Sequence, residues 1–266
     1  MRKRNRSSNS EAVGRAKKSG STPKRQATSH SVDRIYGVHA VCAALANPAR
    51  SVLALYATKN GCDRLNAALD RLPVTPNEIS ATALSKKLGA EAVHQGVMVE
   101  TEQLEQVSLD EIVEDAALGK PLIVLDQVTD PHNVGAILRS AAAFNASALI
   151  MTRRNSPPLD GALAKAASGA VESIPVIHVA NLARALVELG KAGVQRVGLD
   201  GSSEQAFETA DLANPLALVL GAEHKGLRRL TSENCDLLCR LTTPGPLKSL
   251  NVSNAAAVAL HTLAIR

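Results

Sequence analysis

From residue 121 onward the chain alternates short apolar runs with amphipathic or Ala-rich segments, and this alternation is its most constraining feature. The run Leu-Ile-Val-Leu at 122–125 is continuous, as expected of a strand buried on both faces. Strands that alternate with helices predict an α/β fold, with a parallel sheet covered by helices on both faces. The predicted strands are 122–125, 148–151, 174–179, 194–199, 216–220 and 237–241. The predicted helices are 133–145, 159–168, 182–191 and a last helix within the stretch 250–265.

The preceding part of the chain predicts a second, smaller α/β unit. Its apolar patterns indicate strands at 52–56 and 96–99 and helices ending near 45, at 60–72 and at 81–88. An acidic stretch follows, in which Ser108 is placed to cap a helix over 109–117. We therefore expect four parts: 1–31, a basic tail; 32–103, a small domain; 104–120, a linker; and 121–266, the parallel-sheet domain.

The positive charge of the protein is concentrated at its N-terminus. The whole chain carries +5, but residues 1–31 alone carry +8, which leaves −3 for the rest. A polar, basic segment of this kind buries too little apolar surface to fold, so we expect disorder and attraction to polyanions. A solubilising tail and an organelle-import segment remain alternatives.

The remaining composition excludes several classes of protein. There is no secretory signal and no apolar run long enough to span a membrane. The four cysteines, Cys42, Cys62, Cys235 and Cys239, form no paired C-x-x-C set, so we predict packing residues, no metal site and a cytoplasmic location. With no Trp and two each of Tyr and Phe, stacking on aromatic side chains cannot be the main mode of RNA binding.

The last apolar helix begins at an unusual entrance. Asn251 and Ser253 precede an Ala-rich run, and a loop with two prolines around Gly245 comes before them. We expect Ser253 or Asn254 to cap the helix, and the helix to be buried against this chain or a second copy. An ordinary core helix explains the apolar run, but polar groups at its mouth are also typical of ligand sites.

Two further stretches follow predicted strands, at the edge where parallel sheets bind ligands. In the first, Asn133 opens a helix that contains Gly135 and Arg139. The guanidinium of Arg139 stands among apolar residues and needs a partner, and a structural pair with Asp126 or Asp130 remains possible.

In the second stretch, Gly221 and Gly226 flank Glu223, which suggests backbone close to a ligand. Arg228 and Arg229 come next, either as surface charges or as phosphate contacts. No G-x-G-x-x-G follows a predicted strand and no Walker A sequence is present, which argues against an ordinary dinucleotide site.

At these three stretches the sequence resembles the SpoU/TrmH-type family of SPOUT RNA methyltransferases. The matching motifs are Asn133-x-Gly135-x-x-x-Arg139, Gly221-x-Glu223-x-x-Gly226 and Ser249-Leu250-Asn251-Val252-Ser253-x-Ala255. The small domain, with Tyr36-Gly37-x-His39-Ala40 and Val93-His94-Gln95-Gly96, is similar to the family's ribosomal-protein-like RNA-binding domain. Within the family the combination is most similar to enzymes that methylate a guanosine 2′-hydroxyl in 23S ribosomal RNA.

The resemblance implies a deep trefoil knot near the C-terminus, a homodimer and S-adenosylmethionine as cofactor. By motif, Gly221, Leu241 and Leu250 would line the cofactor. The reaction centre would comprise Asn133, Arg139, Glu223, Asn251 and Ser253. The basic tail lies outside the family pattern, and the proline loop 243–246 departs from it.

Two alternatives remain at this point. The motifs do not identify the RNA, so the substrate could be transfer RNA. A non-catalytic RNA-binding or ribosome-assembly protein could keep the same fold, although such a protein need not retain Asn133, Arg139 and Glu223 together.

Overall fold

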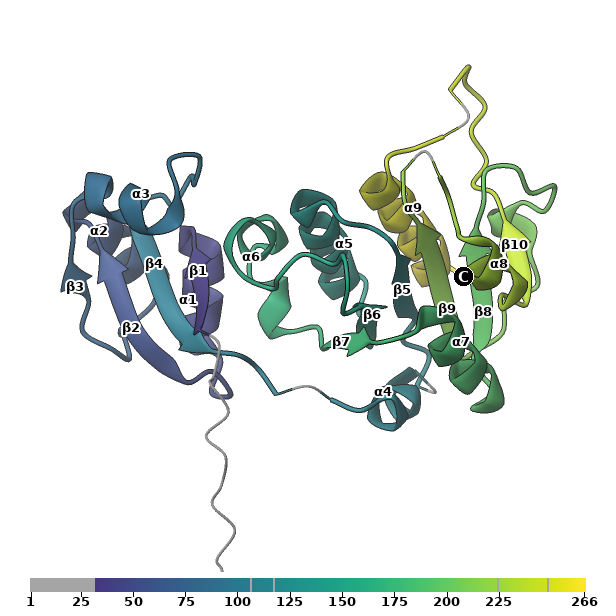
Figure 1. Ribbon diagram of the computed structural model, residues 1–266, viewed down its shortest axis with the longest axis horizontal. Coiled ribbons are helices and arrows are strands. Elements are labelled where there is room, and N and C mark those ends of the chain that lie inside the picture. The colour runs from purple at the N-terminus through teal and green to yellow at the C-terminus, as the bar shows by residue number, and fades with distance from the viewer. Residues whose placement is uncertain (1–31, 106, 117, 224, 248) are drawn as a thin grey trace, which may run out of the picture. The chain divides into compact units, whose positions relative to one another are not determined.

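The structure is a computed structural model that describes residues 32–266 except 106, 117, 224 and 248 (Figure 1). The predicted basic tail, 1–31, lies outside the described residues. Two sheets organise the described chain, a mixed sheet of four strands followed by a sheet of six.

The first sheet has the order β1-β4-β2-β3, in which β4 pairs antiparallel with β1 and β2, and β3 runs parallel to β2. Its strands are β1 (Val32–Tyr36), β2 (Val52–Ala57), β3 (Asn77–Glu78) and β4 (Val97–Glu102). Three helices accompany them, α1 (Val38–Ala46), α2 (Lys59–Ala68) and α3 (Ala81–Leu88). The predicted helix 60–72 therefore ends four residues too late, since the chain is already extended at Leu69.

The second sheet is parallel throughout, in the order β10-β8-β9-β5-β6-β7. Its strands are β5 (Leu122–Asp126), β6 (Ala148–Thr152), β7 (Val176–Val179), β8 (Gln195–Leu199), β9 (Leu216–Gly221) and β10 (Leu237–Cys239). The helices are α4 (Leu109–Ala116), α5 (Pro131–Ala143), α6 (Gly161–Ala167), α7 (Leu182–Lys191), α8 (Arg229–Glu233) and α9 (Val252–Ala264). Short 3-10 turns occur at Ala170–Glu172 and Phe207–Thr209.

Helices cover both faces of the six-stranded sheet, as predicted. Alternate residues of β5 point to opposite sides: Ile123 and Leu125 join a core with α5, α6 and α9, whereas Leu122 and Val124 join a core with α4 and α7. This alternation lets one strand bury both of its faces against helices. The parallel α/β architecture inferred from the alternating pattern is therefore confirmed.

The strand order reverses between β5 and β9. The chain moves outward from β5 through β6 to β7, and then returns to place β8 and β9 on the other side of β5. Asp126 at the end of β5 lies opposite Gly221 at the end of β9. Ligands of open α/β sheets bind in the crevice at such a reversal, outside the carboxyl ends of the strands.

The helices that border this crevice begin earlier than predicted. Helix α5 starts at Pro131 rather than at Asn133, because the Asp130 carboxylate accepts a hydrogen bond from the His132 N–H at 2.9 Å and Pro suits the first position. Helix α9 is capped by Asn251, whose Oδ1 accepts from Ser253 N–H at 2.9 Å. The expected cap at Ser253 or Asn254 is thus wrong, and Ser253 lies in the first turn.

Candidate active site at the strand reversal

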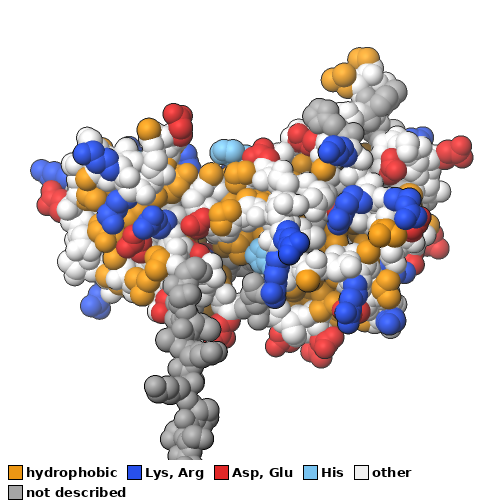
Figure 2. Space-filling model, in the orientation of Figure 1, with side chains coloured by type: hydrophobic (Ala, Val, Ile, Leu, Met, Phe, Trp, Pro, Cys, Tyr) orange, Lys and Arg blue, Asp and Glu red, His pale blue; other side chains and the backbone are white. Residues whose placement is uncertain are grey.

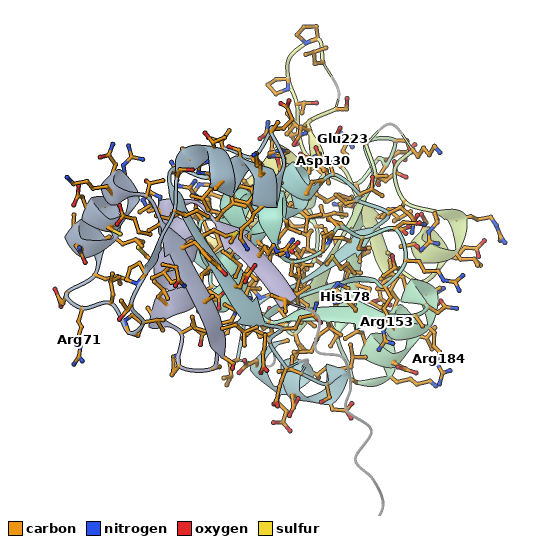
Figure 3. All side chains as sticks on the ribbon, turned by 60° about the vertical axis from the view of Figure 1, so that its left-hand side comes forward. Arg71, Asp130, Arg153, His178, Arg184 and Glu223 are labelled. Atoms are coloured by element: carbon orange, nitrogen blue, oxygen red, sulfur yellow. The ribbon has the colours of Figure 1, made fainter. Side chains whose placement is uncertain are left out.

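Three amide and carboxylate side chains from distant parts of the sequence meet at the crevice. Asn133 Nδ2 donates a hydrogen bond to Glu223 Oε1 at 3.0 Å. Asn251 Nδ2 donates to the same Glu223 oxygen and to Asn133 Oδ1, the latter at 3.1 Å. In Figure 3, Glu223 lies at the same end of the molecule as Asp130, the cap of α5. The structure therefore brings together one residue from each predicted stretch.

Ser253 extends this cluster by one residue. Asn251 Oδ1 accepts from the Ser253 hydroxyl at 2.5 Å and from its backbone N–H at 2.9 Å. The hydroxyl sits on the first turn of α9, so its position is set by the cap of the helix. We call Asn133, Glu223, Asn251 and Ser253 the polar cluster.

A cavity of about 640 Å³ adjoins the polar cluster and reaches Glu223 and Asn251. Its lining includes all three residues expected to line the cofactor site, namely Gly221, Leu241 and Leu250. The lining comes from the ends of β8, β9 and β10 and from the segment that enters α9. The size lies within the range of sites for small molecules and cofactors, about 300–1,000 Å³.

The turn after β8 also lines the cavity, and the sequence analysis did not identify it. Its residues are Asp200, Gly201 and Ser202. Asp200 Oδ1 accepts from the N–H and the hydroxyl of Ser202, at 2.8 and 2.7 Å, so the turn is held by its own side chains. An Asp-Gly pair directly after a predicted parallel strand was the available signal.

Two glycines of the sequence motifs, Gly221 and Gly135, are required by close packing within the protein. A Cβ on Gly221 would lie 2.2 Å from the carbonyl carbon of Gly226, because the loop after β9 returns over its own start. A Cβ on Gly135 would lie 2.6 Å from Ala166 Cβ, because α5 packs closely on α6. Close approach is present at both positions, but the neighbour is the protein itself.

Arg139 is not part of the polar cluster. It lies on α5 with its side chain exposed. The structural pairs considered from the sequence do not form: Asp126 bonds Arg228 and Asp130 caps α5. Among the described residues, none makes a hydrogen bond or ion pair with the Arg139 guanidinium, which leaves it available to an external anion.

The cysteines near the cavity are apolar packing groups. Cys239 belongs to the core and lines the inner wall, and burial raises the pKa of its thiol. Burial also raises the pKa of Cys235 to about 12.

Within the described residues there is no group of three or more His, Cys, Asp or Glu side chains arranged to hold a metal ion. In the same part of the chain, no helix is long and apolar enough to cross a bilayer.

Comparison with known proteins gives two family matches that together span most of the chain. Residues 120–261 match the SpoU rRNA Methylase family, and residues 34–107 match the RNA 2′-O ribose methyltransferase substrate-binding family. The chain belongs to the SpoU rRNA methylase family. The resemblance noted in the three sequence motifs is therefore confirmed.

Relatives within the SpoU family are similar over nearly their whole length. The 23S rRNA (guanosine-2′-O-)-methyltransferase RlmB of Pseudomonas putida is 40% identical, covering 86% of this chain and 94% of the relative. Enzymes of the same name from Ralstonia nicotianae and Vibrio cholerae are both 42% identical; the alignments cover 85% of this chain and 92% and 94% of the relatives.

Solved SpoU structures share the fold. AviRb from Streptomyces viridochromogenes, in complex with AdoMet, superposes with a TM-score of 0.73 at 22% identity, over 88% of this chain and 90% of that chain. A TrmH-family protein from Porphyromonas gingivalis superposes with a TM-score of 0.69 at 22% identity, over 87% and 89%. At these identities the likeness concerns the fold.

Proposed function

We propose that the protein is an S-adenosylmethionine-dependent RNA methyltransferase that transfers a methyl group to the ribose 2′-hydroxyl of a guanosine in 23S ribosomal RNA. The observation that carries the proposal is the polar cluster at the mouth of the cavity, built from all three family motifs. The named relatives that match 92–94% of their own length give the reaction and the RNA.

The cavity suits S-adenosylmethionine in size and in lining. Leu241 and Leu250 offer apolar contacts, and the chain around Gly221 offers backbone groups. These features support their assignment to cofactor binding. When bound, the cofactor supplies a methyl group that is already activated as a sulfonium. The tasks left to the protein are to align the ribose and to assist loss of the hydroxyl proton.

The polar cluster suggests how that alignment is achieved. Asn251 and Ser253 would hold the ribose, and Glu223 would orient Asn133 and Asn251, since its carboxylate accepts from both amides. Among the described residues, the side chains that donate to the Glu223 carboxylate are amides and not arginines, which favours the amides over Arg139 as the groups it orients.

Arg139 is assigned to the phosphate and to the developing alkoxide. A guanidinium with a pKa above about 12 is a poor base, but it stabilises negative charge well. Its exposure, with no partner among the described residues, supports a role toward bound RNA or across a subunit contact.

We extend the proposal to a homodimer and to a deep trefoil knot in 121–266. In favour of the dimer, Val258 of α9 is 42% exposed and Ile265, which directly follows the helix, is 70% exposed. In favour of the knot, Leu241 and Leu250 from the segment between β10 and α9 line the same cavity as the end of β9, and α9 then packs against α5.

The two family matches support a function for each domain of the chain. Residues 32–103 would bind RNA, 104–120 would link, and 121–266 would transfer the methyl group. On the face shown in Figure 2, Lys and Arg are interspersed with Asp and Glu, so the charge of 1–31 would add a separate attraction to RNA. We place the protein in the cytoplasm, where ribosomal RNA is modified in the organisms of its relatives.

The decisive experiment supplies tritium-labelled S-adenosylmethionine with unmodified 23S ribosomal RNA or with total transfer RNA. We expect label in the 23S RNA at one guanosine, mapped by primer-extension stops at low nucleotide concentration. Label found only in transfer RNA would mean that the substrate is transfer RNA and not ribosomal RNA. RNA binding without methyl transfer, under conditions where a known methyltransferase is active, would favour the non-catalytic alternative.

A further inference from the structure

A fully buried carboxylate lies beside the polar cluster without belonging to it. Asp126 ends β5 with an exposed fraction of 0%, and a buried charge is costly unless it is paired. Both of its oxygens accept hydrogen bonds from one residue. Oδ1 accepts from the side-chain Nε of Arg228 at 2.6 Å, and Oδ2 accepts from the backbone N–H of Arg228 at 2.9 Å. The two residues are 102 positions apart in sequence.

This pair closes the loop that carries Glu223. The loop leaves β9 at Gly221, which lies opposite Asp126 in the sheet, and it returns to Asp126 at Arg228. Between these points Gly226 N–H donates to Ala222 O at 2.9 Å. The loop is therefore joined at its base twice, once within itself and once to the end of β5.

We infer that Asp126 and Arg228 are positioning residues for methyl transfer, which hold the loop so that Glu223 meets Asn133 and Asn251. Both ends of this arrangement start from β5: Asp126 ends the strand, and the chain continues from it directly into α5 and Asn133. The inference rests on the proposed function, because it names what fixes the geometry of that same site.

Double-mutant cycles test whether the pair acts through Glu223. Arg228→Met should lower kcat by about 10- to 100-fold, the scale expected for a displaced reaction centre, with the KM for RNA nearly unchanged. In a Glu223→Gln background the same change should cost little, because the group being positioned is already altered. An equal loss in both backgrounds would overturn the inference.

The doubly neutral variant Asp126→Asn/Arg228→Met separates positioning from stability. Removing Arg228 alone leaves an unpaired buried charge, which is strongly destabilising, whereas removing both charges is often nearly neutral. We expect the double variant to recover the Tm but not kcat. Recovery of both would mean that the pair is only structural. Arg228→Lys keeps the charge and the backbone N–H contact but loses the hydrogen bond from Nε, so it should fold with a lowered kcat. The test therefore does not depend on the stability of Arg228→Met.

Hydrogen exchange of the loop amides tests the same inference without a measurement of methyl transfer. Exchange in peptides spanning 221–228 should be faster in Arg228→Lys than in the parent protein. Arg229→Met is the matched control, because the neighbouring guanidinium bonds Glu233 on the surface at 2.6 Å. Unchanged exchange in Arg228→Lys would overturn the inference. Faster exchange together with a parent that methylates no RNA would instead support the role of the Asp126–Arg228 contact in holding the loop and refute the proposed function.

Discussion

Glu223 is the residue through which the three motif segments meet, because its Oε1 accepts hydrogen bonds from two asparagine amides. A carboxylate only accepts, so both amides turn their Nδ2 toward it. Asn251 Oδ1 is thereby directed at Ser253, and Asn133 Oδ1 at Asn251. The charge of one residue fixes the orientation of three polar neighbours.

Arg139 provides the prediction at this scale. Arg139→Ala should lower kcat by about 100- to 1,000-fold, because the developing alkoxide loses its stabilising cation. The Kd of S-adenosylmethionine, measured by calorimetry, should stay near that of the parent, since Arg139 does not line the cavity.

Arg184→Ala is the control for Arg139→Ala. Arg184 is an exposed arginine that points outward from α7 in Figure 3 and pairs with Glu188 in the same helix. Loss of cofactor binding in Arg139→Ala would contradict the assigned role and place this residue in the cofactor site.

At the scale of elements, the sequence predicted the second sheet better than the first. Strands β5, β6 and β9 of the second sheet are nearly continuous apolar runs, which stand out in any chain. Strand β1 did not stand out because Asp33, at one of its buried positions, interrupts the apolar pattern while pairing with Arg50. Strand β3 has only two residues and carries no pattern at all.

The candidate site was also only partly predictable from the sequence. The motif residues could be named from the sequence, because they follow predicted strands or precede a predicted helix. Their contacts could not be named, since the bonded pairs are 28 to 118 positions apart. The Asp126–Arg228 pair was hidden for the same reason, and Asp126 was considered instead as a partner of Arg139.

Gly135 provides a prediction for the packing of α5 on α6. Gly135→Ala should lower the free energy of unfolding by about 1–3 kcal/mol, because the added methyl group meets Ala166 Cβ and Leu163 O, both at 2.6 Å. Urea unfolding measures the change. Gly245→Ala, where an added Cβ meets nothing within 4 Å, should leave the free energy nearly unchanged. Equal stability of the two variants would contradict close packing at Gly135.

The edge strand β10 provides a prediction about pH. The pKa of Asp236, just before β10, is lowered from 3.8 chiefly by its hydrogen bond with Arg196 of β8. A lowered carboxyl pKa contributes stability above the unfolded value and loses it as pH falls through the folded value. The difference in unfolding free energy between the parent and Asp236→Asn should therefore be constant from pH 7 to about 5 and shrink below pH 4. A difference that does not change down to pH 3 would contradict it.

At the scale of the whole molecule, Arg50 connects residues that precede and follow the linker region. Its side chain is 1% exposed, and its guanidinium bonds Asp33 at 3.1 Å and Glu172 at 2.9 Å. The same group donates to Glu102 O at 3.0 Å, and Asn47 donates to Glu172 at 2.7 Å. The first sheet, through Asp33 and Glu102, thus shares one buried ionic network with Glu172 of the turn that precedes β7.

Arg50→Met should lower the free energy of unfolding by about 3–5 kcal/mol, because it leaves two buried carboxylates without their cation. Arg34→Met is the comparison, since that guanidinium is 52% exposed and its pair with Glu100 should contribute about 1 kcal/mol or less. Thermal and urea unfolding measure both. A loss for Arg50→Met no greater than that for Arg34→Met would contradict the network.

The ionic network at Arg50 has a consequence for how an RNA would be chosen. If the part that grips a folded RNA is held at a set separation from the part that modifies it, the target nucleotide is selected by its spacing from the gripped structure. Consider an RNA with one base pair inserted between the bound structure and the target nucleotide. It would still bind, but it would present the wrong ribose to the crevice.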